Sequence, residues 1–245
     1  MWYLNSIRNL LNIFDTFQQK KILNFFKNNL KKDIVLFDIG AHHGETVKFF
    51  LNKFNLKEIH CFEASPINFE ILKKNLKNLD IKQNIYLNNI GAGEKKKSIF
   101  LNQTQESSSS TINTFNQNSN YLKKKLKILN IKNLDKYYKK IPIHVISIDE
   151  YVMDKKIENI DILKIDTEGY EYDIIKGINM SNKFIKFIYF EHHYDDMIQK
   201  NYTFKDINKI LINYGFKKVF KSKMYFRKSF EYIYQNTSFK EVLKK

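Results

Sequence analysis

The stretch 33–50, DIVLFDIGAHHGETVKFF, constrains the fold more than any other part of the sequence. An apolar run over 34–39, interrupted only by Asp38, leads into Gly40, and a helical pattern begins after Gly44. The chain contains only seven glycines, and two of them bracket this turn. Glycine allows left-handed backbone and a close approach to a ligand. The stretch therefore predicts a buried strand, a ligand-binding turn and a helix.

Strands and helices alternate along most of the chain. The expected order is strand 34–39, helix 44–54, strand 58–63, helix 65–78, strand 84–89, strand 160–166, helix 170–179, strand 184–190, helix 203–213, strand 216–220 and a final strand pair at 223–227 and 230–235. Uninterrupted apolar strands are typical of a sheet that is covered on both faces. The pattern therefore predicts an α/β fold with an open, mostly parallel sheet, helices on both faces and an antiparallel edge.

Two segments depart from this alternation. Residues 1–32 show helical spacing and predict an N-terminal helical cap on the main domain, 33–245. Residues 103–140 are first Ser/Asn-rich and then Lys-rich, and extended runs are expected on either side, at 97–101 and 143–149. A polar segment of this length inside a compact domain is typical of a lid over a binding site. We expect 103–140 to be such an insertion or lid.

The composition limits the classes of partner. The formal charge of +16 would suit nucleic acid, but only Arg8 and Arg227 of the 42 basic residues are arginine. Proteins that read nucleic acid favour the bidentate arginine fork, so we expect a solvated lysine-rich surface and no nucleic-acid partner. No apolar run reaches the roughly 20 residues of a membrane span. Cys61 is the only cysteine and the N-terminus shows no secretory signal, which favours a cytoplasmic protein without stable membrane insertion.

Asp38 and Glu63 stand where two apolar strands end. Ligands of parallel α/β sheets bind at this carboxyl edge. The phosphate-binding pattern G-x-G-x-x-G is absent, and a carboxylate beside the loop would repel a pyrophosphate but suits a cation. S-adenosylmethionine carries both a sulfonium and an ammonium. Glu63, 23 positions after Gly40, is placed to accept hydrogen bonds from ribose hydroxyls. These residues favour a cationic adenosine ligand.

A third cluster lies in ILKIDTEGYEYDIIKG, residues 162–177. A buried strand there delivers Asp166, Glu168 and Glu171 to the start of a helix. Helix capping is one interpretation, because carboxylates near a helix N-terminus are stabilised by its dipole. The position of Asp166 directly after the strand also suits a residue that holds a substrate hydroxyl or takes its proton.

The next strand ends in Glu191, His192 and His193, at the same predicted edge. Carboxylates and histidines together form a set for general-base catalysis. We expect Asp166 or His192 to accept the proton of a substrate hydroxyl, with Glu168 and Glu191 orienting it. The same residues could equally form a metal site rich in oxygen and nitrogen ligands, but the spacing matches no specific metal motif, and we assign no metal ligands.

The motifs together resemble one family. FDIGAHHGET, CFEASPINFEILKKN, LNNIGAGEKKKSIFL, VISIDEYV, DILKIDTEGYEYDIIKGI and IYFEHH occur in that order and cover most of residues 34–192. They resemble the FkbM family of S-adenosylmethionine-dependent methyltransferases. KIDTEGYE is the most distinctive and departs from the family's Lys-Ile-Asp-Val-Glu-Gly-x-Glu only at Thr167. His42 stands where the family's glycine loop usually has Asn, and the proline that usually follows Glu63 is shifted to Pro66.

The resemblance implies a class I Rossmann-like methyltransferase with a seven-stranded sheet and S-adenosylmethionine as cofactor. The implied cofactor-binding residues are Asp38, Gly40, His42, Gly44, Glu63 and Asn89, with the small residues 107–111 ordering over the cofactor. The implied acceptor-side residues are Asp149, Asp166, Glu168, Glu171, Glu191 and His192.

The resemblance also implies O-methylation of a hydroxyl on a sugar, glycan precursor or other natural product. Three alternatives stand beside it. A nucleic-acid methyltransferase would use the basic surface, a nicotinamide-dependent oxidoreductase would need a better phosphate loop, and a non-catalytic binding module would keep the fold without the chemistry.

Overall fold

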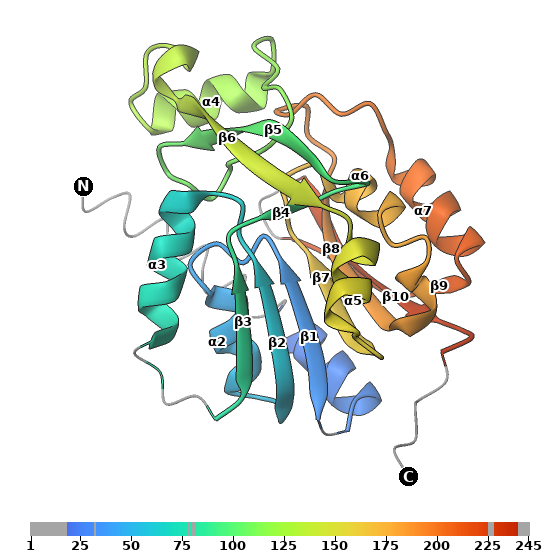
Figure 1. The fold of residues 1–245 in the computed structure, drawn as a ribbon. Coiled ribbons are helices and arrows are strands. Elements are labelled where there is room, and N and C mark those ends of the chain that lie inside the picture. Colours follow the sequence, from blue (N-terminus) through green and yellow to red (C-terminus); the bar gives the residue numbers. More distant parts are fainter. Residues whose placement is uncertain (1–18, 32, 78, 80–81, 225–227, 240–245) are drawn as a thin grey trace.

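Seven strands form one mixed sheet in the computed structural model, which describes residues 19–31, 33–77, 79, 82–224 and 228–239 (Figure 1). In spatial order the strands are β3 (Asn84–Asn88), β2 (Leu56–Phe62), β1 (Ile34–Ile39), β7 (Ile160–Ile165), β8 (Ile185–His193), β10 (Ser229–Asn236) and β9 (Phe216–Lys223). The first five are parallel, and β10 pairs antiparallel with both β8 and β9. The predicted fold class, with its antiparallel edge, is confirmed.

Helices cover both faces of this sheet. They are α2 (Glu45–Leu51), α3 (Pro66–Lys77), α5 (Ile148–Lys155), α6 (Glu171–Lys176) and α7 (Phe204–Asn213), with a 3-10 turn η2 (Ser181–Phe184) before β8. All six residues of β1 are buried and alternate between two cores. Val35, Phe37 and Ile39 pack with α5, α6 and α7, whereas Ile34 and Leu36 pack with α2 and α3. A strand buried on both faces is apolar at nearly every position, and this explains the run that only Asp38 interrupts.

The described part of the predicted N-terminal cap is a layer of the main fold. Residues 1–18 and 32 of that prediction lie outside the described residues, and 19–29 form a helix. Phe26 of this helix is fully buried, with its ring 5.9 Å from those of Phe50 and Phe187. The helix therefore covers one face of the sheet beside α2. Within the described chain, no helix combines the length and apolarity needed to cross a bilayer.

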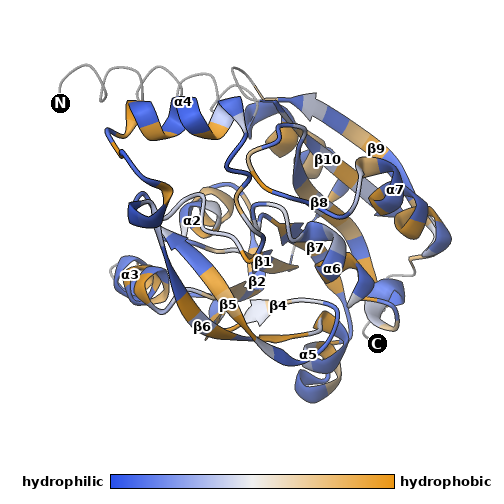
Figure 2. Ribbon diagram, turned by 90° about the horizontal axis from the view of Figure 1, so that it is seen from above, coloured by the Kyte–Doolittle hydropathy of each residue, from blue (hydrophilic) through white to orange (hydrophobic). Residues whose placement is uncertain are grey.

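A second, three-stranded sheet is built mainly from the extended segments on either side of 103–140, the range predicted to be an insertion or lid. Its order is β4 (Gly91–Ala92), β6 (Tyr138–Ile146) and β5 (Lys97–Thr104), and β5 and β6 are antiparallel. Between β5 and β6 lie α4 (Asn120–Ile128) and the 3-10 turn η1 (Leu134–Lys136). In Figure 1 this sheet lies above the carboxyl ends of β1, β2 and β3, and Figure 2 views it from above, with α4 mainly hydrophilic.

The prediction of an extended run over 143–149 is wrong after residue 146. The strand β6 stops at Ile146 and α5 begins at Ile148, so Asp149 is helical. Ser147 is the N-cap, and a reciprocal capping box with Glu150 starts the helix. The pattern Ser-x-x-Glu that signals such a box is present in the sequence and was the overlooked clue. Of the final predicted pair, 225–227 lie outside the described residues.

Candidate active site

A pocket of about 280 Å³ opens at the carboxyl ends of the parallel strands. Its walls come from the turn after β1, the ends of β2, β7 and β8, and the segment 107–112 that leads out of β5. The volume is near the lower end of the range for small-molecule pockets, which begins at about 300 Å³. The pocket thus lies where the sequence placed the ligand site, at the strand ends.

The turn after β1 depends on left-handed backbone at three positions. Gly40, His42 and Gly44 have φ values of +82°, +47° and +88°. A Cβ on Gly40 would lie 1.9 Å from the carbonyl oxygen of Asp166, and one on Gly44 would lie 2.9 Å from a methyl carbon of Leu72. The two glycines are therefore required by packing of the protein against itself. Gly40 and His42 line the pocket, whereas Gly44 is absent from its walls.

Glu63 ties the β1 turn to the end of β2. Its buried carboxylate accepts hydrogen bonds from the backbone N–H groups of His42, at 2.8 Å, and Ser65, at 2.9 Å. Burial raises the pKa of Glu63, and these two N–H groups oppose the shift. Asn89 lies behind this arrangement, where its side-chain amide donates to the carbonyl of Glu63 at 2.8 Å. Glu63 lines the pocket, and Asn89 supports it from outside the lining.

A buried lysine links the ends of β1 and β7. The Nζ of Lys164 lies 3.2 Å from Oδ1 of Asp38 and 3.3 Å from Oδ2 of Asp166. Asp38 is completely buried and does not line the pocket, while Lys164 and Asp166 do. The carboxylate of Asp38 is the partner of Lys164, and the role expected for Asp38 at the cofactor site stays a prediction. The lysine within the apolar run ILKI was the signal for this pair in the sequence.

Glu168 and His193 form an ion pair at the pocket wall, where β7 and β8 end. Glu168 has a left-handed φ of +51°, and Thr111 holds its carbonyl by a hydrogen bond of 2.7 Å. Its Oε2 lies 3.5 Å from Nε2 of His193, which is 3.7 Å from Oε1 of Glu191. Glu168 and Glu191 line the pocket. His193 was expected at this edge with Glu191 and His192, but no individual role was predicted for it.

Burial sets the ionisation of this cluster. It raises the pKa of Glu168 to about 7, against the opposing charge of His193. Burial alone would lower the pKa of His193, but the surrounding carboxylates, with Glu168 foremost, raise it to about 10. The pair therefore contains a carboxyl group that titrates near neutral pH beside a cationic imidazole. Perturbed carboxyls in a pocket are typical of catalytic acids and bases.

Three residues predicted for the acceptor side lie elsewhere. His192 points to the opposite side of β8 from its neighbours, against Tyr194 and Phe204, and burial lowers its pKa to about 3. Glu171 is buried and accepts from the backbone N–H of Gly169 at 2.9 Å. His192, Glu171 and the third residue, Asp149, are all absent from the pocket lining.

Asp149 has a structural contact of its own. Its carboxylate accepts hydrogen bonds from the backbone N–H groups of Met180, at 2.9 Å, and Ser181, at 2.7 Å. Because side chains alternate along β8, His192 points away from the pocket. The carboxylates of Glu171 and Asp149 accept hydrogen bonds from backbone N–H groups. All three residues lie outside the pocket lining, and a role for them at the site stays a prediction.

The polar segment closes one side of the pocket. Ser107, Ser108, Ser110 and Ile112 line it, and Ser107 Oγ lies 2.7 Å from Nε2 of His42. The segment also contacts the loop after β7, because Asn113 donates a hydrogen bond of 2.5 Å to the carbonyl of Gly169. Residues 107–113 thus form part of the pocket wall and contact both the β1 turn and the loop after β7.

The lining suits a cation with hydrogen-bonding groups. Its carboxylates outnumber its cations, although the whole chain carries a formal charge of +16. The lining carboxylates are Glu45, Glu63, Asp166, Glu168 and Glu191. Asn68 Oδ1 and the Tyr170 hydroxyl are buried lining groups that have no partner among the described residues. Unpaired buried polar groups at a pocket wall fit a ligand that supplies the missing hydrogen bonds. Glu63, Asn68 and the 40–42 turn would hold S-adenosylmethionine.

Solved structures share this fold. A methyltransferase FkbM from Methylobacillus flagellatus KT matches with a TM-score of 0.52 and 16% identity, over 84% of this chain and 44% of that one. Magnesium protoporphyrin IX methyltransferase from Synechocystis PCC 6803, solved with bound S-adenosylmethionine, matches with a TM-score of 0.51 and 8% identity, over 92% and 81%. A putative rRNA-methylase from Clostridium thermocellum matches with a TM-score of 0.50 and 10% identity, over 91% and 97%. Identities this low show the fold alone.

The family is shown by the sequence. No curated protein matches the chain. The model of the methyltransferase FkbM domain matches residues 38–218, from the end of β1 into β9. This span contains every strand end that forms the pocket, and it covers more than half of the 245 residues. The chain therefore belongs to the FkbM family of methyltransferases, whose cofactor is S-adenosylmethionine.

Proposed function

We propose that this domain transfers the methyl group of S-adenosylmethionine to a hydroxyl group of a sugar, a glycan precursor or another polar natural product. The cofactor supplies an electrophilic methyl group when bound. The protein then has to align the acceptor and remove its proton. A hydroxyl must lose its proton as it attacks, so a base at the pocket wall is the group that O-methylation requires.

The proposal is supported by the position of Glu168 in the pocket wall and by its raised pKa. Its carboxyl lines the pocket and its pKa is raised to about 7 by burial. A general base works best when its pKa is near the operating pH. His193, at 3.5 Å, would stabilise the carboxylate and fix its orientation. The backbone of Glu168 is left-handed, a local strain that persists where the surrounding structure holds a functional residue in place.

Asp166 and Glu191 take orienting roles in the proposal. Asp166 lies beside the Lys164 ammonium, at 3.3 Å, and is partly exposed at the pocket wall. A carboxylate held in this way can accept a hydrogen bond from the acceptor without taking its proton. The rim near these groups contains hydroxyl side chains, including Ser107, Ser108 and Thr167. A rim rich in hydroxyl groups and carboxylates suits a polar, hydroxyl-bearing acceptor.

A methyl-transfer assay tests the proposal. The full chain is incubated with S-adenosylmethionine labelled with tritium in its methyl group and with separate pools of sugars, nucleotide sugars, hydroxylated natural products and RNA. We expect label in a hydroxylated small molecule or glycan, in a form that resists alkali, as methyl ethers do and methyl esters do not. Label in RNA alone would overturn the proposed acceptor class.

A variant separates chemistry from cofactor binding. Glu168→Gln should lower the turnover number by about 10²–10⁴-fold, the usual contribution of a general base. Cofactor affinity, measured by calorimetry, should change little. Glu70→Gln, an exposed change on α3, is the matched control. Unchanged turnover in Glu168→Gln would refute its role as the base.

A further inference from the structure

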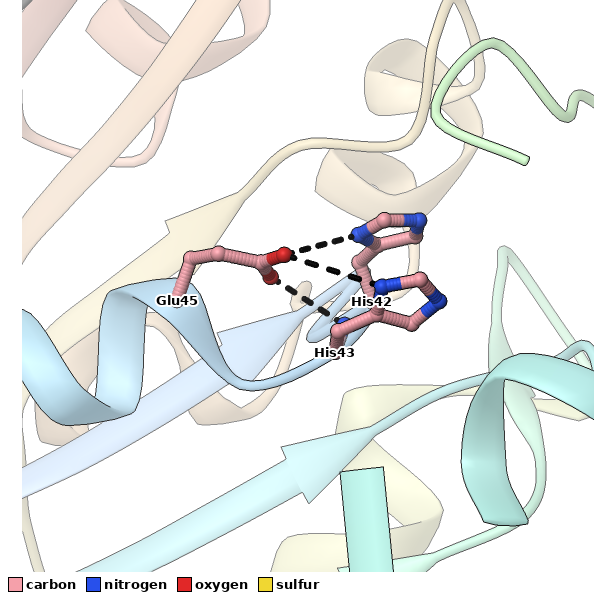
Figure 3. Close-up of side chains that lie close together, drawn as sticks. All are labelled: His42, His43 and Glu45. Carbon is pink, nitrogen blue, oxygen red and sulfur yellow. Dashed lines mark hydrogen bonds and ion pairs between the residues drawn. The ribbon is translucent and has the colours of Figure 1, made fainter. Parts of the chain in front are cut away.

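The turn after β1 brings together three side chains that can bind a metal ion. His42, His43 and Glu45 each offer one donor atom, and the three donors lie within 4.8 Å of one another (Figure 3). Within the described residues this is the one group of three or more His, Cys, Asp or Glu side chains that converges to this degree. We propose that these three residues form a binding site for a divalent transition-metal ion of the Zn²⁺ class at the rim of the cofactor pocket.

The backbone turn creates the site. In extended chain, neighbouring side chains point in opposite directions. His42 adopts a left-handed φ of +47° and Gly44 one of +88°, so the two rings instead stack, with centroids 3.7 Å apart and planes 22° apart. Glu45, the first residue of α2, folds back toward both rings, as Figure 3 shows. Its Oε1 lies 3.3 Å from Nδ1 of His42 and 3.8 Å from Nδ1 of His43.

The donor set selects the kind of ion. Two histidine nitrogens and one carboxylate are the protein ligands of several catalytic zinc sites, which leave a fourth position open. With zinc–ligand bonds of about 2.0–2.2 Å, donors in a tetrahedral site lie roughly 3.3 Å apart. The contacts of Glu45 are already close to this separation. Mg²⁺ and Ca²⁺ require mainly oxygen ligands, and a single carboxylate does not supply them.

Ser107 supplies the outer contact expected for a metal-binding histidine. Such histidines usually donate their second ring N–H to an oxygen, which fixes the tautomer. Nε2 of His42 lies 2.7 Å from Oγ of Ser107, so a proton on Nε2 leaves Nδ1 free to coordinate. Because His42 and Glu45 also line the pocket, the ion would lie at the pocket rim, beside the predicted cofactor.

Metal titration of the untagged full chain tests the site without any methyl acceptor. Zinc chloride is titrated in a calorimeter, and cobalt chloride is followed by its visible absorption bands, which report nitrogen coordination. We expect one tightly bound ion per chain, and no comparable binding of magnesium chloride. Loss of a group that only hydrogen-bonds to a metal ligand typically weakens metal binding 10–100-fold. Loss of a ligand itself, in His43→Ala, should therefore weaken zinc binding by at least about 100-fold.

Two further variants keep the test decisive. Glu45→Gln changes an exposed side chain and should also weaken binding while leaving the circular dichroism spectrum unchanged. His144→Ala, on β6 beside Ser98, removes a histidine outside the site and should bind zinc as the parent chain does. Binding of zinc with equal affinity by the parent, His43→Ala and Glu45→Gln chains would overturn the proposal, as would failure of the parent to bind zinc.

Discussion

Replacement of Lys164 by methionine should destabilise the fold by about 3–5 kcal/mol at pH 7, the usual cost of removing one partner of a buried ion pair. Asp38 is 0% exposed, and its Oδ2 has no hydrogen-bond partner among the described residues. Without the ammonium at 3.2 Å, Asp38 must be buried either as an uncompensated charge or in its protonated form. For a chain of this size the loss corresponds to a fall of roughly 6–20 °C in Tm.

The size of the effect can be checked through its pH dependence. Burial already raises the pKa of Asp38 above its ordinary value, and loss of Lys164 removes the main opposing charge. Keeping a carboxyl protonated at pH 7, about three pH units above the unfolded value near 3.9, costs at most about 4 kcal/mol. Because the folded pKa is raised, this penalty is present at pH 7 and shrinks as pH falls toward about 4.

Urea denaturation at pH 7 and pH 5 measures the prediction. The loss of unfolding free energy in the Lys164→Met chain should be smaller at pH 5 than at pH 7. At pH 7, adding Asp38→Asn should restore most of the lost free energy. Lys73→Met, which breaks an exposed ion pair with Glu70, should cost less than about 1 kcal/mol. The Lys164→Met chain could lose as little unfolding free energy as the control, or its loss could persist in the Asp38→Asn background. Either result would refute the role of the buried pair between Lys164 and Asp38.

Three further outcomes are expected. The rate constant kcat/KM should rise with pH through about 7 and then level, because Glu168 acts as a carboxylate; a profile flat from pH 6 to 8 would contradict this. Gly40→Ala should prevent stable folding, judged by circular dichroism, because the new Cβ would lie 1.9 Å from the Asp166 carbonyl oxygen; a native spectrum with an unchanged Tm would disprove the clash. Asp149→Ala should lower stability to urea by on the order of 3 kcal/mol, since two backbone N–H groups at η2 lose a charged acceptor, while the KM for the acceptor stays constant; an altered KM would restore Asp149 to the site.

Local patterns in the sequence were sufficient for the architecture. Mostly apolar strands, helical spacing and the Asp38-x-Gly40 turn predicted the α/β order, because strands buried on both faces are apolar at most positions. The start of α5 was missed although the Ser147–Glu150 capping box was present, because the apolar run before it suggested a longer strand. The same local chemistry predicted that a ligand site lies at the strand ends.

The roles of individual polar residues depended on contacts between distant segments. Asp38 and Asp166 have similar positions after apolar strands, yet only the packing of β1 beside β7 shows that Lys164 lies between them. His192 and His193 are adjacent in the chain, and the alternation of β8 turns one into an aromatic cluster and the other toward Glu168.

The sequence by itself determined the order of strands and helices, the edge of the sheet at which the ligand binds and the family, because these follow from periodicity and from motifs read along the chain. The tertiary structure alone decided which carboxylates face the pocket, which one titrates near neutral pH, and how His42 and His43 come to share Glu45. These properties depend on burial and on distances across the fold, and both arise only when segments far apart in the sequence pack together.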